Sequence, residues 1–282
     1  MIVNETVRPD GLRIVTGCLP ESKRVHLRFV CNRGSADDPI GKHGTAHLFE
    51  HMVFRGTMQR TTSEVSLFLK RRALDYGAST SAIDITYYLE VAVVRGHEAL
   101  SFLADLYFKP LFSTEDLLDE CQLIIKEAKS DLDNEYRRAF GLLGRALWAN
   151  HPTVRFTDTD ELEQAVLITR DHLLVVHQKW HVPHNTMLVC AGGIPHDETC
   201  RLLEACIPIQ QEQEHCSIPL YDDEFDVSPR ENHVVLPWQN RSLATTIYGC
   251  KYPRLSDRRG SILSIDTWRR YCSMEQDHVC GT

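Results

Sequence analysis

The sequence lacks several features that define large classes of protein. No stretch approaches the roughly 18 uninterrupted apolar residues that a transmembrane helix needs. Residues 1–6 hold no basic segment followed by an apolar run, so we expect no secretory signal and a cytoplasmic location. The ten cysteines form no Cys-x-x-Cys pair, which argues against a structural zinc site built from them. In the cytoplasm, we expect them to be small buried hydrophobic residues or inert thiols.

An excess of basic residues is also missing. The 282 residues include 39 acidic and 31 basic side chains, which gives a formal net charge of −8. A dedicated nucleic-acid-binding protein needs a basic face to neutralise phosphates, so the composition disfavours that class. The hydrophobic content of 43% and charged content of 25% are those of an ordinary globular protein. The length suffices for one large or two modest domains.

Local patterns predict a mixture of strands and helices. Short runs of β-branched and aromatic residues, some of them alternating, predict strands at 12–15, 26–31, 86–94 and 186–191. Apolar residues repeating every three or four positions predict helices at 45–54, 63–76, 98–108, from 113 onward, 137–148, 161–165, 170–179 and 197–205. Thr45 is the expected N-cap of the first helix, and Ser113 that of the long one.

The composition changes between residues 208 and 230. This stretch is rich in proline, glutamine and acidic residues, which is typical of a linker. Strand signals then begin again, as they do near the N-terminus. We therefore expect an N-terminal catalytic domain at 1–207, a linker at 208–230, and an incomplete second domain of the same type at 231–282.

The densest motif is His47-x-x-Glu50-His51 on the helix predicted at 45–54. These three positions lie on one face of a helix. Two imidazoles one turn apart can each give one nitrogen to a tetrahedral zinc ion. Glu50 beside them can accept a proton from zinc-bound water. The rest of this helix is apolar nearly all round, so we expect it to be buried and its polar side chains to need partners.

A third ligand is expected on the long helix that follows. Glu120 and Glu127 lie two turns apart on nearly the same face of an amphipathic pattern. A carboxylate pair on an apolar stripe is costly to bury without a cation, and a metal ion would supply one. The predicted site therefore has His47, His51 and Glu127 as zinc ligands, with Glu50 as the catalytic base.

These motifs resemble those of one peptidase family. The segments 33–39 and 43–57 look like those of the M16 peptidases, which include pitrilysin, insulinase and the mitochondrial processing peptidase. Glu120 and Glu127 stand where that family places a glutamate that supports a ligand and the third zinc ligand, so the resemblance implies that Glu120 is a catalytic residue beside Glu50. The resemblance implies an α+β fold with an antiparallel sheet backed by helices. It also implies a zinc metalloendopeptidase that binds its peptide substrate as a strand at a sheet edge.

Three differences from the family qualify this expectation. Ala78 stands where the family has an asparagine that holds the substrate backbone, and Thr157 or Thr159 stands at a family glycine. The family's second domain supplies an arginine and a tyrosine to the site, and here that domain is only begun. We therefore expect either a truncated chain or a homo- or heterodimer whose partner supplies the missing half.

The same residues are also compatible with other assignments. The chain could be a non-catalytic or partner-dependent subunit of a heteromeric peptidase. It could also resemble S-ribosylhomocysteine lyase, with Cys121 as a metal ligand in place of Glu127, although we expect Cys121 to be a core residue. His177, His181 and His184 could hold a second metal ion, but the sequence favours solvated histidines near a surface turn.

Overall fold

The computed structural model describes residues 2–134, 137, 141 and 158–209. The helix predicted at 137–148 lies almost entirely outside these residues, as do nearly all of the predicted linker and the whole of the predicted second domain. The division into two domains therefore stays a prediction. No helix within the described residues is long and apolar enough to cross a membrane.

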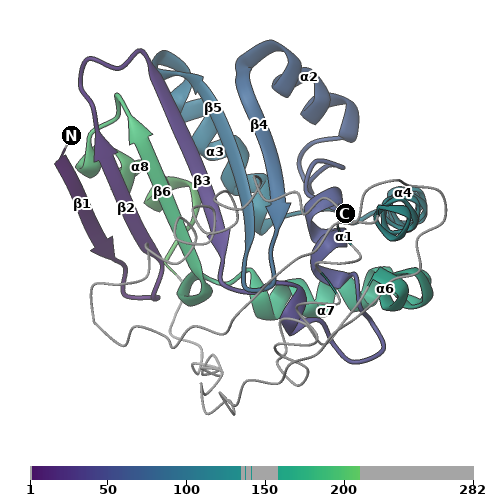
Figure 1. Cartoon of the computed structure of the whole chain (residues 1–282). Coiled ribbons are helices and arrows are strands. Elements are labelled where there is room, and N and C mark those ends of the chain that lie inside the picture. The colour runs from purple at the N-terminus through teal and green to yellow at the C-terminus, as the bar shows by residue number, and fades with distance from the viewer. Residues whose placement is uncertain (1, 135–136, 138–140, 142–157, 210–282) are drawn as a thin grey trace, which may run out of the picture. The chain divides into compact units, whose positions relative to one another are not determined.

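The described strands form one sheet, in the order β1-β2-β6-β3-β5-β4 (Figure 1). The strands are β1 (Ile2–Val7), β2 (Arg13–Cys18), β3 (Arg24–Cys31), β4 (Ala73–Thr80), β5 (Ile85–Ala92) and β6 (Thr186–Gly192). Neighbouring strands are antiparallel, except that β2 and β6 are parallel. The predicted α+β fold is confirmed, and its mainly antiparallel sheet includes one parallel pair.

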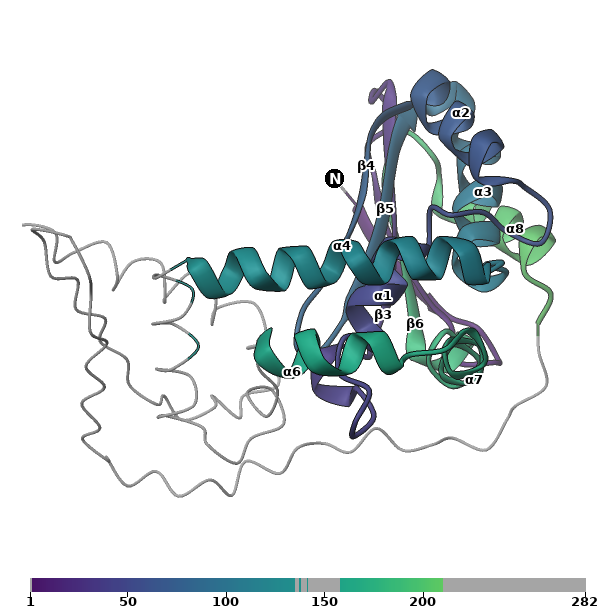
Figure 2. The ribbon, with the colours of Figure 1, turned by 90° about the vertical axis from the view of Figure 1, so that its right-hand side faces the viewer.

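Helices cover one face of this sheet and form the core with it. Figure 2 shows α2 (Thr62–Arg72), α3 (Gly96–Phe108) and α8 (His196–Cys206) on the same side of the strands. Val25, Leu27 and Phe29 alternate along β3 and are completely buried, as the two-residue repeat of a strand requires. The other α-helices within the described residues are α1 (Thr45–Met52), α4 (Thr114–Asp133), α6 (Asp158–Gln164) and α7 (Arg170–Trp180).

Two strands were missing from the sequence prediction. The helix predicted at 63–76 ends at Arg72, and the chain continues directly into β4. Residues 73–76 include good helix formers, but pairing with β5 satisfies their backbone groups and overrides that preference. Strand β1 shows no regular alternation of buried residues because it is an exposed edge strand of the sheet. β4 is the other edge strand of the sheet among the described residues.

The N-terminal end of α1 is capped by a distant carboxylate. The prediction that Thr45 is the N-cap was wrong, because Gly44 occupies that position with a left-handed φ of 95° and has no side chain to offer. Asp38 replaces it: its Oδ2 accepts from the Gly44 N–H at 2.8 Å and its Oδ1 from the Ala46 N–H at 2.9 Å. Asp38 is buried, so these contacts satisfy donors that water cannot reach.

The long helix α4 begins and packs as its sequence pattern predicts. Ser113 Oγ accepts a hydrogen bond from the Asp116 N–H, which is the expected N-cap contact. Its buried positions recur at helical spacing: Leu117, Glu120, Cys121, Ile124 and Ala128. This face packs against α1 and α6, and Figure 2 shows α4 crossing α1 with α6 running beside it. The packing places residues of three helices around the histidine motif.

Candidate metal centre

Helices α1 and α4 bring three ligand-type side chains together. Glu127 Oε2 lies 3.4 Å from His47 Nε2 and 3.5 Å from His51 Nε2. One ligand atom from each of the three residues lies within 4.8 Å of the others. The two imidazole rings meet edge to face, with centroids 4.8 Å apart. Residues separated by 76 positions (127 − 51) therefore converge on one point.

The Nδ1 atom of each imidazole is hydrogen-bonded to a carboxylate. His51 Nδ1 donates to Glu120 Oε2 at 2.7 Å, and His47 Nδ1 donates to Glu161 Oε1 at 2.7 Å. A carboxylate accepts hydrogen bonds, so these contacts place the ring proton on Nδ1 in both histidines. Both Nε2 atoms then keep a lone pair on the side that faces Glu127.

The charges around the site favour a cation. Burial lowers the pKa of His47, but the hydrogen bond and charge of Glu161, with the charges of Glu50 and Glu127, outweigh it and raise that pKa above its ordinary value. The Glu127 side chain is 55% exposed, against 26% for His47 and 16% for His51. The site is therefore acidic, half-buried at its base and open to solvent on the side of Glu127.

The buried carboxylate of Glu120 has a second partner. Its side chain is only 3% exposed, and Arg55 forms a close ion pair with its Oε1 atom. A lone carboxylate would be costly at this depth, and the guanidinium compensates part of that cost. Arg55 follows α1 and thereby links the end of the motif helix to α4.

Glu50 is available for proton transfer. It lies on α1 between the two histidines in sequence and is half-buried. Among the described residues, its carboxylate has no hydrogen bond or ion pair, while its charge contributes to the raised pKa of His47. A half-buried carboxylate near the ligands and without a partner can act as a general base.

The donor set fits a zinc ion. Two imidazole nitrogens and one carboxylate oxygen are the ligand types of a catalytic zinc site, which keeps a fourth position for water or substrate. The hydrogen bonds at both Nδ1 atoms are the support that ligand histidines usually have. His47, His51 and Glu127 form such a cluster, and no second one occurs in the part of the chain that the structure describes.

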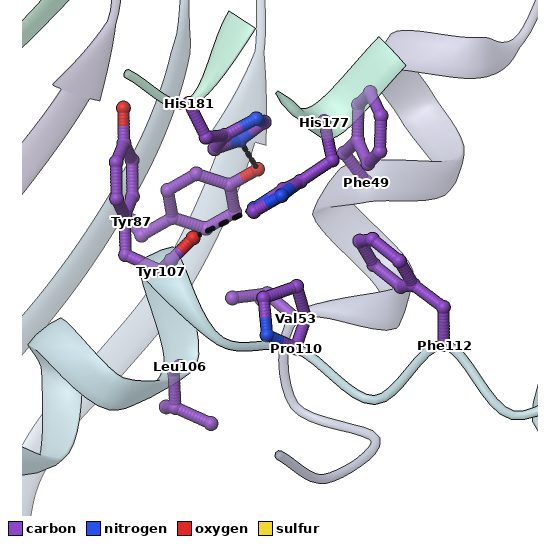
Figure 3. A pocket seen from close by; sticks show the side chains of 9 residues that line it. All are labelled: Phe49, Val53, Tyr87, Leu106, Tyr107, Pro110, Phe112, His177 and His181. Atoms are coloured by element: carbon purple, nitrogen blue, oxygen red, sulfur yellow. Dashed lines mark hydrogen bonds between the residues drawn. The ribbon is translucent and has the colours of Figure 1, made fainter. Parts of the chain in front are cut away.

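A small pocket beside Phe49 of α1 belongs to the core (Figure 3). It is lined by aromatic and aliphatic residues and by His177 and His181, and it leaves only about 10 Å³ for the centre of a water molecule. One water at most fits in that space, so it is not a peptide site.

The prediction that these histidines are solvated was wrong for His177 and His181. Their rings stack with centroids 4.4 Å apart, and both are buried. His177 Nε2 donates to the Tyr107 carbonyl at 2.9 Å, and His181 Nε2 pairs with the Tyr87 hydroxyl at 3.0 Å. Burial lowers the pKa of His177 to about 4 and holds the pKa of His181 well below its usual value. The sequence pattern did not reveal that α7 packs with His177 facing the core.

Cys121 does not take the place of Glu127. Its thiol is buried and lies 3.6 Å from the Ala165 carbonyl oxygen, and burial raises its pKa. The prediction that Cys121 is a core residue is confirmed. The lyase-type ligand set of two histidines and this cysteine is therefore not assembled in the structure.

Glu161, which contacts His47, and Arg55, which contacts Glu120, could not be predicted from the sequence pattern. Glu161 lies on a short helix 114 positions from His47, and Arg55 lies just beyond α1. Neither has a spacing that relates it to the motif. Only the packing of α6 and α4 against α1 identifies them.

Comparisons with known proteins place this sequence among peptidases. The model of the insulinase family, peptidase family M16, matches residues 13–158. An uncharacterized zinc protease of Rickettsia bellii (strain RML369-C) is 27% identical over 199 residues, which cover 69% of this chain and 47% of that protein. The mitochondrial-processing peptidase subunit beta of Caenorhabditis elegans is 26% identical over 199 residues, covering 71% and 43%. The chain thus spans about half the length of the curated relatives it matches.

Solved structures show the same fold. A protease from Helicobacter pylori superposes with a TM-score of 0.70 at 19% identity, covering 77% of this chain and 52% of that one. The periplasmic protease PqqL from Escherichia coli gives a TM-score of 0.68 at 19% identity, covering 77% and 25%. The family model matches more than half of the sequence, and its match includes the histidine motif and Glu127. This chain belongs to the insulinase family of peptidases, M16.

Proposed function

We propose that this chain carries the catalytic centre of a zinc metallopeptidase that hydrolyses peptides or unfolded segments. The observation that carries the proposal is the convergence of His47, His51 and Glu127, whose ligand atoms lie within 4.8 Å of one another at an acidic, partly exposed site. The relatives that are named zinc proteases support the same metal.

The residues around the metal have separate tasks. When bound, zinc would polarise the scissile carbonyl group and lower the pKa of a nearby water molecule. Glu50 accepts a proton from the attacking water and then delivers it to the leaving amine, since its carboxylate is not engaged elsewhere among the described residues. Glu120 touches neither substrate nor water in this scheme, and it acts by holding the His51 ring.

The edge strand β4 is the proposed place for the substrate backbone. Its outer edge has no partner strand in the described residues, so an extended peptide can add there by backbone hydrogen bonds. The strand lies beside the motif helix, since Thr80 Oγ1 donates to the Ala46 carbonyl at 3.4 Å. Ala78 has no side-chain amide at the position of the family asparagine, so the backbone of β4 alone binds the substrate backbone.

A partner or a further domain would complete the active site. The chain covers less than half of the two curated relatives described above, one of which is named a subunit. We propose that a second chain, of the same or of another kind, contributes to the active site. The alternative is that the chain serves such an assembly without catalysing the reaction itself.

Metal content and peptide cleavage by the full chain test the proposal. Bound zinc is measured for wild type, for Glu50→Gln and for a control in which the exposed Glu163 is replaced, Glu163→Gln. Each chain is then incubated with a library of unstructured peptides, and the cleavage products are quantified. We expect about one zinc per chain in all three, as two histidines and a carboxylate predict. Glu50→Gln is expected to cleave about 10² to 10⁴ times more slowly than the other two.

The outcomes separate the two readings. Stoichiometric zinc without any cleavage that depends on Glu50 favours the non-catalytic or partner-dependent subunit. A wild-type chain that binds no zinc overturns the proposal.

A further inference from the structure

Helix α6 is docked in a defined register against the start of α1. The His43 N–H donates to Gln164 Oε1 at 2.9 Å. Gly44, the N-cap of α1, lies directly against Glu161, since a Cβ atom at position 44 would come within 3.2 Å of the Glu161 Cγ atom. Gly44 also has a φ of 95°, which side chains rarely allow. The backbone of α1 can therefore approach α6 closely at this point.

This register places the Glu161 carboxylate next to the Nδ1 atom of His47, the first histidine of the motif. The Glu161 side chain is 12% exposed, and its Oε1 atom lies 2.7 Å from His47 Nδ1. Glu120 has the same relation to His51, at the same distance but from α4. Each ring is therefore held by its own carboxylate, and the two carboxylates come from different helices.

We propose that Glu161 is a positioning residue of the metal centre, an inference that rests on the proposed zinc function. It keeps the His47 proton on Nδ1 and fixes the ring so that Nε2 faces Glu127. Without this acceptor, the imidazole can adopt the other tautomer or rotate about its side-chain bonds. His47 is more exposed than His51, so its surroundings restrain the ring less and the hydrogen bond matters more.

A positioning role differs from a merely structural ion pair in what it changes. An ion pair that serves only the fold affects the stability of the metal-free protein and leaves zinc affinity unchanged. Carboxylates that orient a ligand histidine typically change metal affinity by about 10- to 100-fold. Zinc affinity and the stability of the metal-free protein therefore distinguish the two roles.

The test compares wild type with Glu161→Ala, Glu161→Gln and the control Glu163→Gln, which alters an exposed carboxylate on the same helix. Zinc affinity is measured by competition with a chromophoric chelator, and ligand geometry by the visible absorption of the cobalt-substituted protein. The melting temperature of each chain is recorded in the presence of a chelator.

We expect Glu161→Ala to bind zinc about 10- to 100-fold more weakly and to alter the cobalt spectrum. Glu161→Gln should lose less, because its amide oxygen still accepts from Nδ1 although the charge is gone. The control should match wild type, and metal-free melting temperatures should agree. Zinc affinity of Glu161→Ala within twofold of wild type, or an equal loss in the control, overturns the inference. A wild type without zinc instead refutes the proposed function.

Discussion

We expect the buried histidine pair to make this fold sensitive to acid. His177 lies against His181 in the core, and burial lowers its pKa from 6.5 to about 4. Above pH 6.5 its ring is neutral in both the folded and the unfolded chain, so it adds no pH dependence there. Between 6.5 and about 4, the unfolded chain binds a proton that the folded chain does not. Stability therefore falls as the pH falls through this window.

The size of the effect follows from the two pKa values. A pKa of 6.5 in the unfolded chain and about 4 in the folded chain lowers the free energy of unfolding by about 2 kcal/mol at pH ~5, and by about 3 kcal/mol at pH ~4 and below. His181 shifts in the same direction and adds to the loss. Since domains are stable by only about 5–15 kcal/mol, this loss is a large share of the total.

Urea denaturation of the metal-free chain at several pH values measures the effect. His177→Gln is the informative variant, because its amide can still donate to the Tyr107 carbonyl but does not titrate. We expect wild type to lose about 2 kcal/mol more than this variant between pH ~7.5 and pH ~5. Replacing the exposed His97 by Gln provides a control that should follow wild type. Parallel pH profiles of wild type and His177→Gln would refute the argument that His177 is buried and neutral.

Two further predictions concern the motif helix and its metal. Asp38→Ala removes the acceptor of two buried N–H groups at the start of α1. It should lower the free energy of unfolding, measured by urea denaturation, by about 2–4 kcal/mol, and Asp38→Asn should have an intermediate effect. A loss below about 0.5 kcal/mol for Asp38→Ala would contradict the capping role. Zinc at 100 times its dissociation constant should stabilise the chain by about 2.7 kcal/mol, so chelation should lower the melting temperature of wild type. His51→Ala should melt at the same temperature with and without zinc, and an unchanged response to chelator would count against His51 as a ligand.

Local spacing made the long helices and the motif predictable. In α4, apolar residues repeat every three or four positions, and the cap at Ser113 has the expected contact. Residues 73–76, the first half of β4, were mistaken for helix, because their preference is weak and pairing with β5 decides their conformation. An edge strand made by pairing leaves little signal in its own sequence.

The sequence by itself determined that His47, Glu50 and His51 share one helix face, because that relation depends only on the pitch of a helix. It also singled out Glu127 on a second helix, but that carboxylate meets the histidines only through the packing of α4 on α1. The tertiary structure alone decided that Glu161 supports His47, that Asp38 caps α1, and that His177 is buried. These contacts join segments whose separation follows no local period, so their partners are set by how the helices pack.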